Sequence, residues 1–123
     1  GTTLDFLSLN AKKVILIYPI PELGFYPLET KLNEAKFIDE NEISLKYESI
    51  YWEEFSQEIN IFFDNIYKKN LSKLRTQDIF CNSFEDKYCV AEDDDIIYYW
   101  DDDHLSYDGA GLLGDKISII LNK

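Results

Sequence analysis

Between residues 52 and 66, bulky apolar side chains recur at intervals of three or four positions. Acidic, amide and lysine side chains fill many of the positions between them. This period predicts an amphipathic helix over about residues 49–69 whose apolar stripe packs on a sheet. An aromatic stripe at helical spacing is typical of a core, so we infer no ligand site from it. The stripe consists of Trp52, Phe55, Ile59, Phe62, Phe63 and Ile66.

Shorter apolar runs predict strands. Residues 12–18 form a β-branched run with lysines before it and prolines after it, a pattern typical of a buried strand. Pro19 and Pro21 cannot continue a hydrogen-bonded ladder, so this strand leads at its C-terminal end into a loop, where open α/β sheets form ligand sites. We also expect an irregular excursion with a short helical turn over residues 22–42, and strands over residues 78–80 and 96–100.

A second helix is predicted near the C-terminus. Ser106 is a favourable N-cap, and Asp108 lies in the first turn, where a negative charge is stabilised. The alternation of strands and helices predicts an α/β fold, and 123 residues without repeats or linkers predict one domain. The expected buried stripe of this helix is Leu112, Leu113, Ile117, Ile120 and Leu121.

The charge of the chain excludes some partners. Asp and Glu number 24 against 12 Lys and Arg, a formal net charge of −12. Phosphate backbones and anionic membrane surfaces would repel such a chain, so we expect no nucleic-acid partner. No apolar run approaches the roughly 20 residues of a membrane span, and no signal peptide is recognisable. The chain begins with Gly1 and contains no methionine, which favours a piece of a longer protein.

Cys81 and Cys89 flank a polar stretch. Their even number suits a disulfide that closes a short surface loop in an oxidising compartment, and two free structural thiols are the alternative. Two cysteines and one histidine fall short of a zinc site, so we expect neither a metal nor a cofactor.

His104, the single histidine, follows Asp101 by three residues at a predicted junction between a strand and a helix. A tight turn there would place the carboxylate on the imidazole, orienting a base for proton transfer from a serine. A solvated acidic loop that happens to contain a histidine is the alternative reading. Calcium binding by Asp102, Asp103 and the acidic run of residues 92–95 is a third, although the spacing matches no EF-hand loop.

Residues 98–110 (YYWDDDHLSYDGA) resemble the last block of SGNH hydrolases, in particular the SGNH domain attached to integral-membrane acyltransferases that O-acetylate bacterial surface polysaccharides. That block carries Asp-x-x-His, Leu-Ser, two residues and Gly-Ala, and all of these are present here. Residues 14–24 resemble the family's strand and Pro-x-Pro loop, and Cys81 and Cys89 fall where the family places a cysteine pair. By this resemblance the fold is a three-layer flavodoxin-like one, His104 is the general base, and Asp101 orients it. Asp102 and Asp103 gain no catalytic role from the motif.

The resemblance also implies what this sequence lacks. An SGNH enzyme takes its nucleophile from a Gly-Asp-Ser block, and none is present. We therefore expect residues 1–123 to be the C-terminal part of one SGNH-like domain, inactive by itself because the serine lies outside the chain. The resemblance implies a sugar or polysaccharide acyl acceptor, a membrane acyltransferase domain in the parent chain, and a periplasmic or extracytoplasmic location.

Two further readings remain open from the sequence. One is a non-catalytic acidic extracytoplasmic module that binds a protein or a carbohydrate, for which the 9 tyrosines would provide stacking surfaces. The other is a half-domain that associates with itself through an exposed sheet edge.

Overall fold

A computed structural model describes residues 2–27, 30 and 45–123. The expected excursion over residues 22–42 lies largely outside these described residues. The elements, in chain order, are α1 (Thr2–Asn10), β1 (Val14–Ile17), β2 (Lys46–Glu48), α3 (Ser49–Asp64), β3 (Leu71–Leu74), α4 (Gln77–Phe80), β4 (Tyr88–Val90), β5 (Glu92–Asp93), β6 (Ile96–Ile97) and α5 (Tyr107–Leu121).

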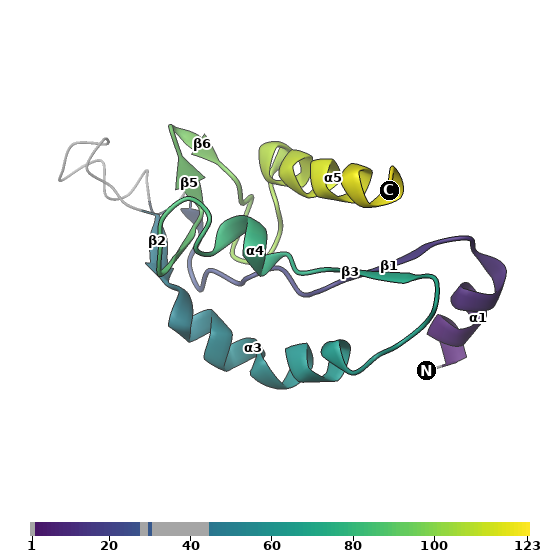
Figure 1. The fold of residues 1–123 in the computed structure, drawn as a ribbon. Coiled ribbons are helices and arrows are strands. Elements are labelled where there is room, and N and C mark those ends of the chain that lie inside the picture. Colours follow the sequence, from purple (N-terminus) through teal and green to yellow (C-terminus); the bar gives the residue numbers. More distant parts are fainter. Residues whose placement is uncertain (1, 28–29, 31–44) are drawn as a thin grey trace.

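A parallel pair of strands lies between two helices. β1 pairs with β3 in parallel, from Val14 opposite Leu71 to Ile17 opposite Leu74. Parallel neighbours need a long crossover, and α3 is part of the one used here. Figure 1 shows α5 on one side of this pair and α3 on the other. The predicted mixed α/β composition is confirmed, because the described residues form both helices and small sheets.

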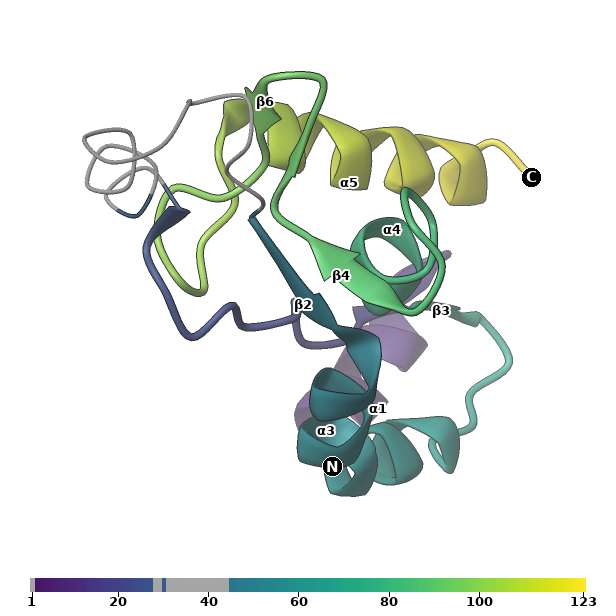
Figure 2. The ribbon, with the colours of Figure 1, turned by 90° about the vertical axis from the view of Figure 1, so that its left-hand side faces the viewer.

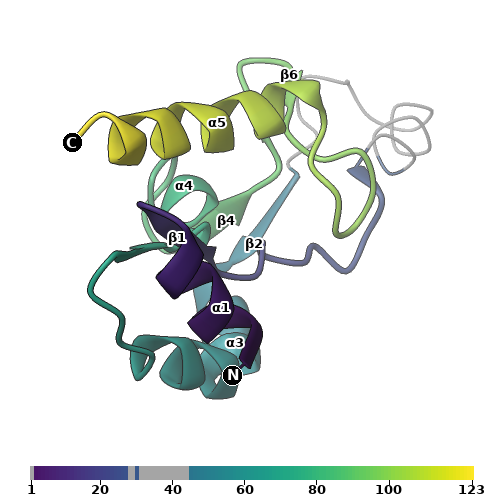
Figure 3. The same ribbon diagram turned by 90° about the vertical axis from the view of Figure 1, so that its right-hand side faces the viewer.

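The first predicted strand is present as β1, but it is half-buried rather than buried. Ile17 is 40% exposed, and the other three residues are intermediate. The physical reason is that β1 has a single partner, β3, among the described strands, so one edge lacks a neighbour. At the far end of this sheet, α1 is attached to the segment that follows α3: Asn70 donates to the carbonyl oxygen of Ala11, and Lys68 pairs with Asp5 (Figure 3).

Strands β2 and β4 form an antiparallel pair (Figure 2). Strand β4 contains Cys89, one of the two cysteines of the disulfide. Cys89 of β4 pairs with Tyr47 of β2. On its other side, the backbone of Cys89 forms an isolated β-bridge with that of Cys81. The two sulfur atoms are bonded, so the disulfide reading is confirmed and the free-thiol alternative is wrong. The bridge is buried against Trp52 of α3 and thereby joins the sheet to this helix.

The acidic run of residues 92–95 forms a hairpin. β5 and β6 pair antiparallel across two residues, Asp94 and Asp95, which have φ angles of 48° and 63°. This left-handed conformation is the one that two-residue hairpins require, and Asp tolerates it better than most residues. The run therefore has a local structural role that needs no bound cation.

Helix α3 begins at Ser49 as predicted and ends at Asp64, five residues before the expected end. The predicted burial of its stripe is only partly correct: Trp52 is buried, whereas Phe55 is 72% exposed and Phe62 is 62% exposed. The face of α3 that turns inward is partly polar. Its polar side chains can be buried because each has a hydrogen-bond partner in the interior. Asn60 donates to the Gln77 side chain of α4, across the interface between the helices. The buried residues of α3 are Ser49, Trp52, Ser56 and Asn60.

Two predicted strands are corrected. Residues 78–80 belong to the helix α4, whose Phe80 is fully buried. Of residues 96–100, the first two form β6, and Tyr99 instead makes an isolated bridge with Leu105. A short apolar run such as residues 78–80 is compatible with either a strand or a buried helical turn. Here the run is helical, and Phe80 is buried in the core.

The C-terminal helix is confirmed, with Ser106 as its N-cap. Leu112 and Leu113 pack on the main core, whereas Leu121, predicted to be buried, is 55% exposed. Phe80 contacts Tyr99 with ring centroids 5.5 Å apart. No helix among the described residues is long and apolar enough to cross a membrane. The core consists of Leu23, Leu45, Ile79, Phe80, Ala91, Tyr98 and Tyr99.

We expect the disulfide to contribute about 2–3 kcal/mol to the free energy of unfolding, because it closes a short loop in the unfolded chain. The double variant Cys81→Ser, Cys89→Ser should lose this amount in urea denaturation followed by circular dichroism. Adding reductant should destabilise the unmodified protein and leave the double variant unchanged. Equal sensitivity of both proteins to reductant would contradict this prediction.

Candidate functional site

The loop of residues 101–104 joins the end of the β5–β6 region to α5. Its two ends are close together, because the Trp100 N–H donates to the His104 carbonyl oxygen at 2.8 Å. The adjoining bridge between Tyr99 and Leu105 continues this closure. Asp101 and His104 therefore lie on one tight turn, as their spacing predicts.

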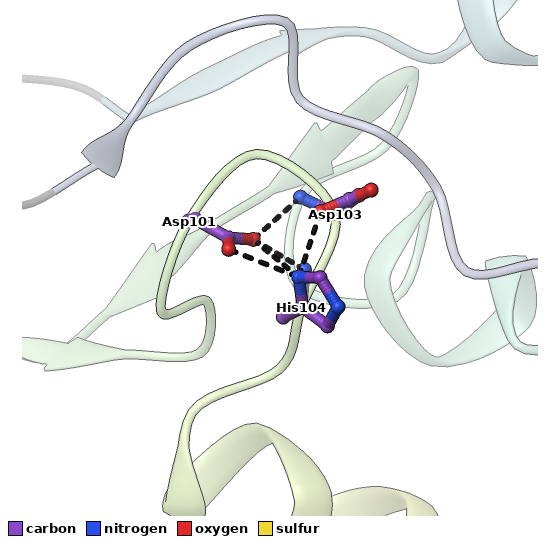
Figure 4. Close-up of side chains that lie close together, drawn as sticks. All are labelled: Asp101, Asp103 and His104. Carbon is purple, nitrogen blue, oxygen red and sulfur yellow. Dashed lines mark hydrogen bonds and ion pairs between the residues drawn. The ribbon is translucent and has the colours of Figure 1, made fainter.

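Within the turn, the Asp101 carboxylate accepts hydrogen bonds from two backbone N–H groups and from the His104 ring (Figure 4). Its Oδ1 accepts from the backbone N–H groups of Asp103 at 3.0 Å and His104 at 2.7 Å. The His104 ring places Nδ1 at 3.0 Å from Oδ1 and 2.9 Å from Oδ2. The backbone bonds hold the carboxylate in position, and the carboxylate in turn holds the hydrogen on Nδ1. Nε2 then carries the lone pair of the neutral ring, the arrangement that a histidine base needs.

The electrostatics of the turn follow from these contacts. The backbone N–H of Asp103, followed by that of His104, lowers the pKa of Asp101, so this carboxylate stays ionised. The hydrogen bond that the ring Nδ1–H donates to Asp101 raises the pKa of His104 above its ordinary value. The His104 side chain is 73% exposed and that of Asp101 is 26% exposed, so water screens their attraction.

Asp103 is a residue for which the sequence predicts no catalytic role. Its Oδ1 lies 2.8 Å from Nδ1 of His104, on the same ring nitrogen that Asp101 contacts. Partial desolvation and the neighbouring Asp101 raise the pKa of Asp103. Its position directly before the histidine was the available signal, but the resemblance gave weight to Asp101 alone. The Asp102 side chain lies outside the acidic and imidazole group that the structure brings together.

The Pro-x-Pro loop lies directly against this turn. The Leu23 N–H donates to the carbonyl oxygen of Asp102 at 2.8 Å. The buried Tyr99 hydroxyl donates to the carbonyl oxygen of Pro21 at 2.7 Å. At the start of the loop, the buried Thr76 hydroxyl donates to the carbonyl oxygen of Pro19, also at 2.7 Å. Two segments separated by about 80 residues are thus joined at the site.

The residues after the histidine anchor α5. The Ser106 hydroxyl accepts from the Gly109 N–H at 3.2 Å and donates to the Ile97 carbonyl oxygen at 2.7 Å. A Cβ atom at position 109 would lie 2.1 Å from the Tyr98 carbonyl oxygen, so glycine is required by close approach of the helix. Ser106 is therefore a cap, as predicted, and its hydroxyl is occupied by structural hydrogen bonds.

The donor atoms of Asp101, Asp103 and His104 lie within 4.8 Å of one another, a group that could hold a metal ion. Carboxylates and imidazole suit several divalent metals. The same atoms already satisfy one another by hydrogen bonding, and acidic residues on an exposed loop commonly cluster without a metal, so we assign none. The hairpin carboxylates of residues 92–95 are not part of this group.

A titration of the single imidazole tests the site directly. We expect the His104 pKa, followed by NMR of the ring protons, to lie above 6.5, and Asp101→Asn to lower it more than Asp103→Asn does. The bond between the protonated His104 ring and Asp101 contributes fully to the stability of the fold below pH 6.5. This contribution disappears as the pH rises through the His104 pKa of the folded state. A larger shift from Asp103→Asn would show that the primary partner is misassigned.

Comparison with known proteins supports one family. Searches of curated proteins and of solved structures found no match. The family model for the SGNH domain (fused to AT3 domains) matches residues 1–118, which include the whole 101–104 turn and both cysteines. This match covers nearly the whole chain and agrees with the resemblance seen in residues 98–110, so the chain belongs to the SGNH domain family, in the form that is fused to AT3 domains.

Proposed function

We propose that this chain is the C-terminal part of a three-layer, flavodoxin-like SGNH domain that moves an acetyl group to or from a hydroxyl of a bacterial surface polysaccharide. The observation that carries the proposal is the Asp101–His104 hydrogen bond of 2.9 Å within the matched family block. It supplies an oriented base, two of the three members of a serine-type triad.

In this proposal His104 acts as the general base and Asp101 as the residue that orients it. Nε2 takes the proton from a serine hydroxyl while the serine oxygen attacks the acetyl carbonyl carbon, and Asp101 stabilises the imidazolium that forms. The bond between the acetyl carbon and the leaving group of the acetyl donor then breaks, and Nε2 gives its proton to that leaving group, which leaves an acyl-enzyme. A sugar hydroxyl or water next attacks the acyl-enzyme while Nε2 takes its proton, and the serine oxygen receives this proton as the ester bond to the serine breaks. The raised pKa of His104 restricts this chemistry to pH values at which the ring is neutral.

The serine is proposed to lie outside residues 1–123. The sequence has no Gly-Asp-Ser block, and Ser106, the serine nearest to His104 in the sequence, is occupied as a helix cap. The ring contacts of His104 within the described residues come from Asp101 and Asp103, and no described serine is among them.

Family membership also supports a proposal about the partners and the location of the protein. We propose that the parent chain carries a membrane acyltransferase domain that supplies the acetyl group, and that this domain lies in the periplasm or outside the cell. The disulfide between Cys81 and Cys89 supports an oxidising compartment. The net charge of −12 supports a domain that stays dissolved beside an anionic membrane surface.

A binding module without catalysis is the second candidate. The 73% exposure of the His104 side chain favours it, because a catalytic imidazole is normally enclosed when the reaction proceeds. The two functions differ in whether substitution of His104 affects acetylation.

We expect the 123-residue chain by itself to hydrolyse p-nitrophenyl acetate no faster than its His104→Ala variant does. Without the serine, covalent catalysis is lost, and the residual rate should be that of the background reaction. Release of p-nitrophenol at 405 nm provides the measurement. A rate that depends on His104 would show that a nucleophile lies within this chain.

In the parent protein, His104→Ala and Asp101→Asn should each lower the O-acetyl content of the polysaccharide, with a loss in rate of about 10²–10⁴-fold for the histidine. Asp102→Asn is the matched control, since it removes the same charge from the same loop without touching the ring. Acetyl content is measured by NMR of the isolated polysaccharide. Unchanged acetylation in both His104→Ala and Asp101→Asn would favour the binding module.

A further inference from the structure

Two carboxylates contact the same ring nitrogen of His104. Oδ1 of Asp103 lies 2.8 Å from Nδ1, and the nearer oxygen of Asp101 lies 2.9 Å from the same atom. Figure 4 shows the two contacts reaching this atom from different directions. The neutral ring has a single hydrogen to donate from Nδ1, so the two carboxylates share it.

The two carboxylates differ in their other contacts. Oδ1 of Asp101 also accepts from the backbone N–H groups of Asp103 and His104, at 3.0 and 2.7 Å. These bonds close the turn, so Asp101 has a structural task besides orienting the ring. Within the described part of the chain, the ring is the hydrogen-bond donor that contacts the Asp103 carboxylate.

The backbone around Asp103 is held in place by three hydrogen bonds. The Leu23 N–H donates to the carbonyl oxygen of Asp102, and the Trp100 N–H donates to that of His104, both at 2.8 Å. The N–H of Asp103 itself is bonded to Asp101. With the backbone fixed, the short Asp103 side chain has few rotamers available. The fold of the turn thus directs its carboxylate to the ring.

We propose that Asp103 is a second positioning residue for His104, whose carboxylate shares the Nδ1 hydrogen with Asp101. A hydrogen held on Nδ1 leaves the lone pair on Nε2, the atom that takes the serine proton in the proposed mechanism. Two negative charges beside Nδ1 also stabilise the imidazolium that forms. The inference rests on the proposed function in treating His104 as a base, but the position of the hydrogen is measured without catalysis.

Few charged groups determine how the ring responds to pH. Among the described residues, Asp101 and Asp103 are the charged groups that act on His104, and both raise the pKa of the ring. The Asp102 side chain lies on the same turn but outside this group. Removing the Asp103 charge should therefore lower the pKa of His104, and removing the Asp102 charge should leave that pKa unchanged.

The test is NMR of the isotope-labelled 123-residue chain above the His104 pKa, where the two neutral tautomers differ in their ring nitrogen shifts. In an Asp101→Asn background, adding Asp103→Asn should lower the ratio of the Nδ1–H to the Nε2–H tautomer about threefold or more, because a charge-assisted but exposed hydrogen bond is lost. Adding Asp102→Asn instead is the matched control and should leave the ratio unchanged.

Both added substitutions should keep the turn. Within the described residues, the side chain that accepts the backbone hydrogen bonds of this turn is that of Asp101, and it is the same in the two variants. The difference between the variants therefore reports on the contact between Asp103 and the ring.

Acetylation by the parent protein provides a second readout. Asp103→Asn should shift the acidic limb of the pH–rate profile to lower pH, because the ring stays neutral at lower pH. Asp101→Asn with Asp103→Asn should lower the rate by more than the product of the two single losses, since each carboxylate can partly replace the other. A merely structural role for Asp103 would lower the rate without moving the pH limb.

Three results would overturn the inference: a tautomer ratio that Asp103→Asn leaves unchanged, an equal change of this ratio with Asp102→Asn, or a His104 pKa indifferent to Asp103→Asn. A tautomer ratio indifferent to Asp103 beside acetylation that depends on His104 would refute this inference alone. A tautomer ratio that depends on Asp103 beside acetylation indifferent to His104 would refute the proposed catalysis alone.

Discussion

The hydrogen bond from the buried Tyr99 hydroxyl to the Pro21 carbonyl oxygen joins the two halves of the candidate site. Tyr99 is 2% exposed and packs on Phe80, and burial raises the pKa of its phenol, which therefore remains a neutral donor. Pro21 belongs to a loop that prolines keep out of the sheet, so its carbonyl oxygen is free to accept. Because this bond is buried, its loss would leave two polar groups without water.

The consequences of this junction extend in both directions along the chain. On one side, Tyr99 forms the bridge with Leu105 that flanks the 101–104 turn, so its position helps to determine where Asp101 and His104 lie. On the other side, Pro21 precedes Leu23, whose N–H donates to the carbonyl oxygen of Asp102. The Pro-x-Pro loop and the turn that orients the imidazole are thus held together by this pair of hydrogen bonds.

Polar satisfaction also explains the unexpected orientation of α3. The apolar period alone predicts that Phe55 and Phe62 face inward, yet Ser56 and Asn60 occupy the buried side. Ser56 donates to the Trp52 carbonyl oxygen, and Asn60 bonds both Ser56 and Gln77, so these polar groups enter the interior with partners. Phe55 and Phe62 are therefore left exposed on the outer side of the helix.

The sequence by itself determined the features that depend on neighbouring residues. The Asp101-x-x-His104 turn and the Ser106 cap each involve groups fewer than ten residues apart. The disulfide between Cys81 and Cys89 does so as well, although the sequence left two free thiols as the alternative. Only the tertiary structure decided which face of α3 is buried, that residues 78–80 are helical, and that Asp103 also reaches the imidazole. It alone placed Leu23 against Asp102 and Trp52 against the disulfide. The physical reason is that the spacing of apolar residues shows which face of a helix or strand is apolar. Which face is buried, and against which element, depends on contacts and hydrogen bonds between segments far apart in the sequence.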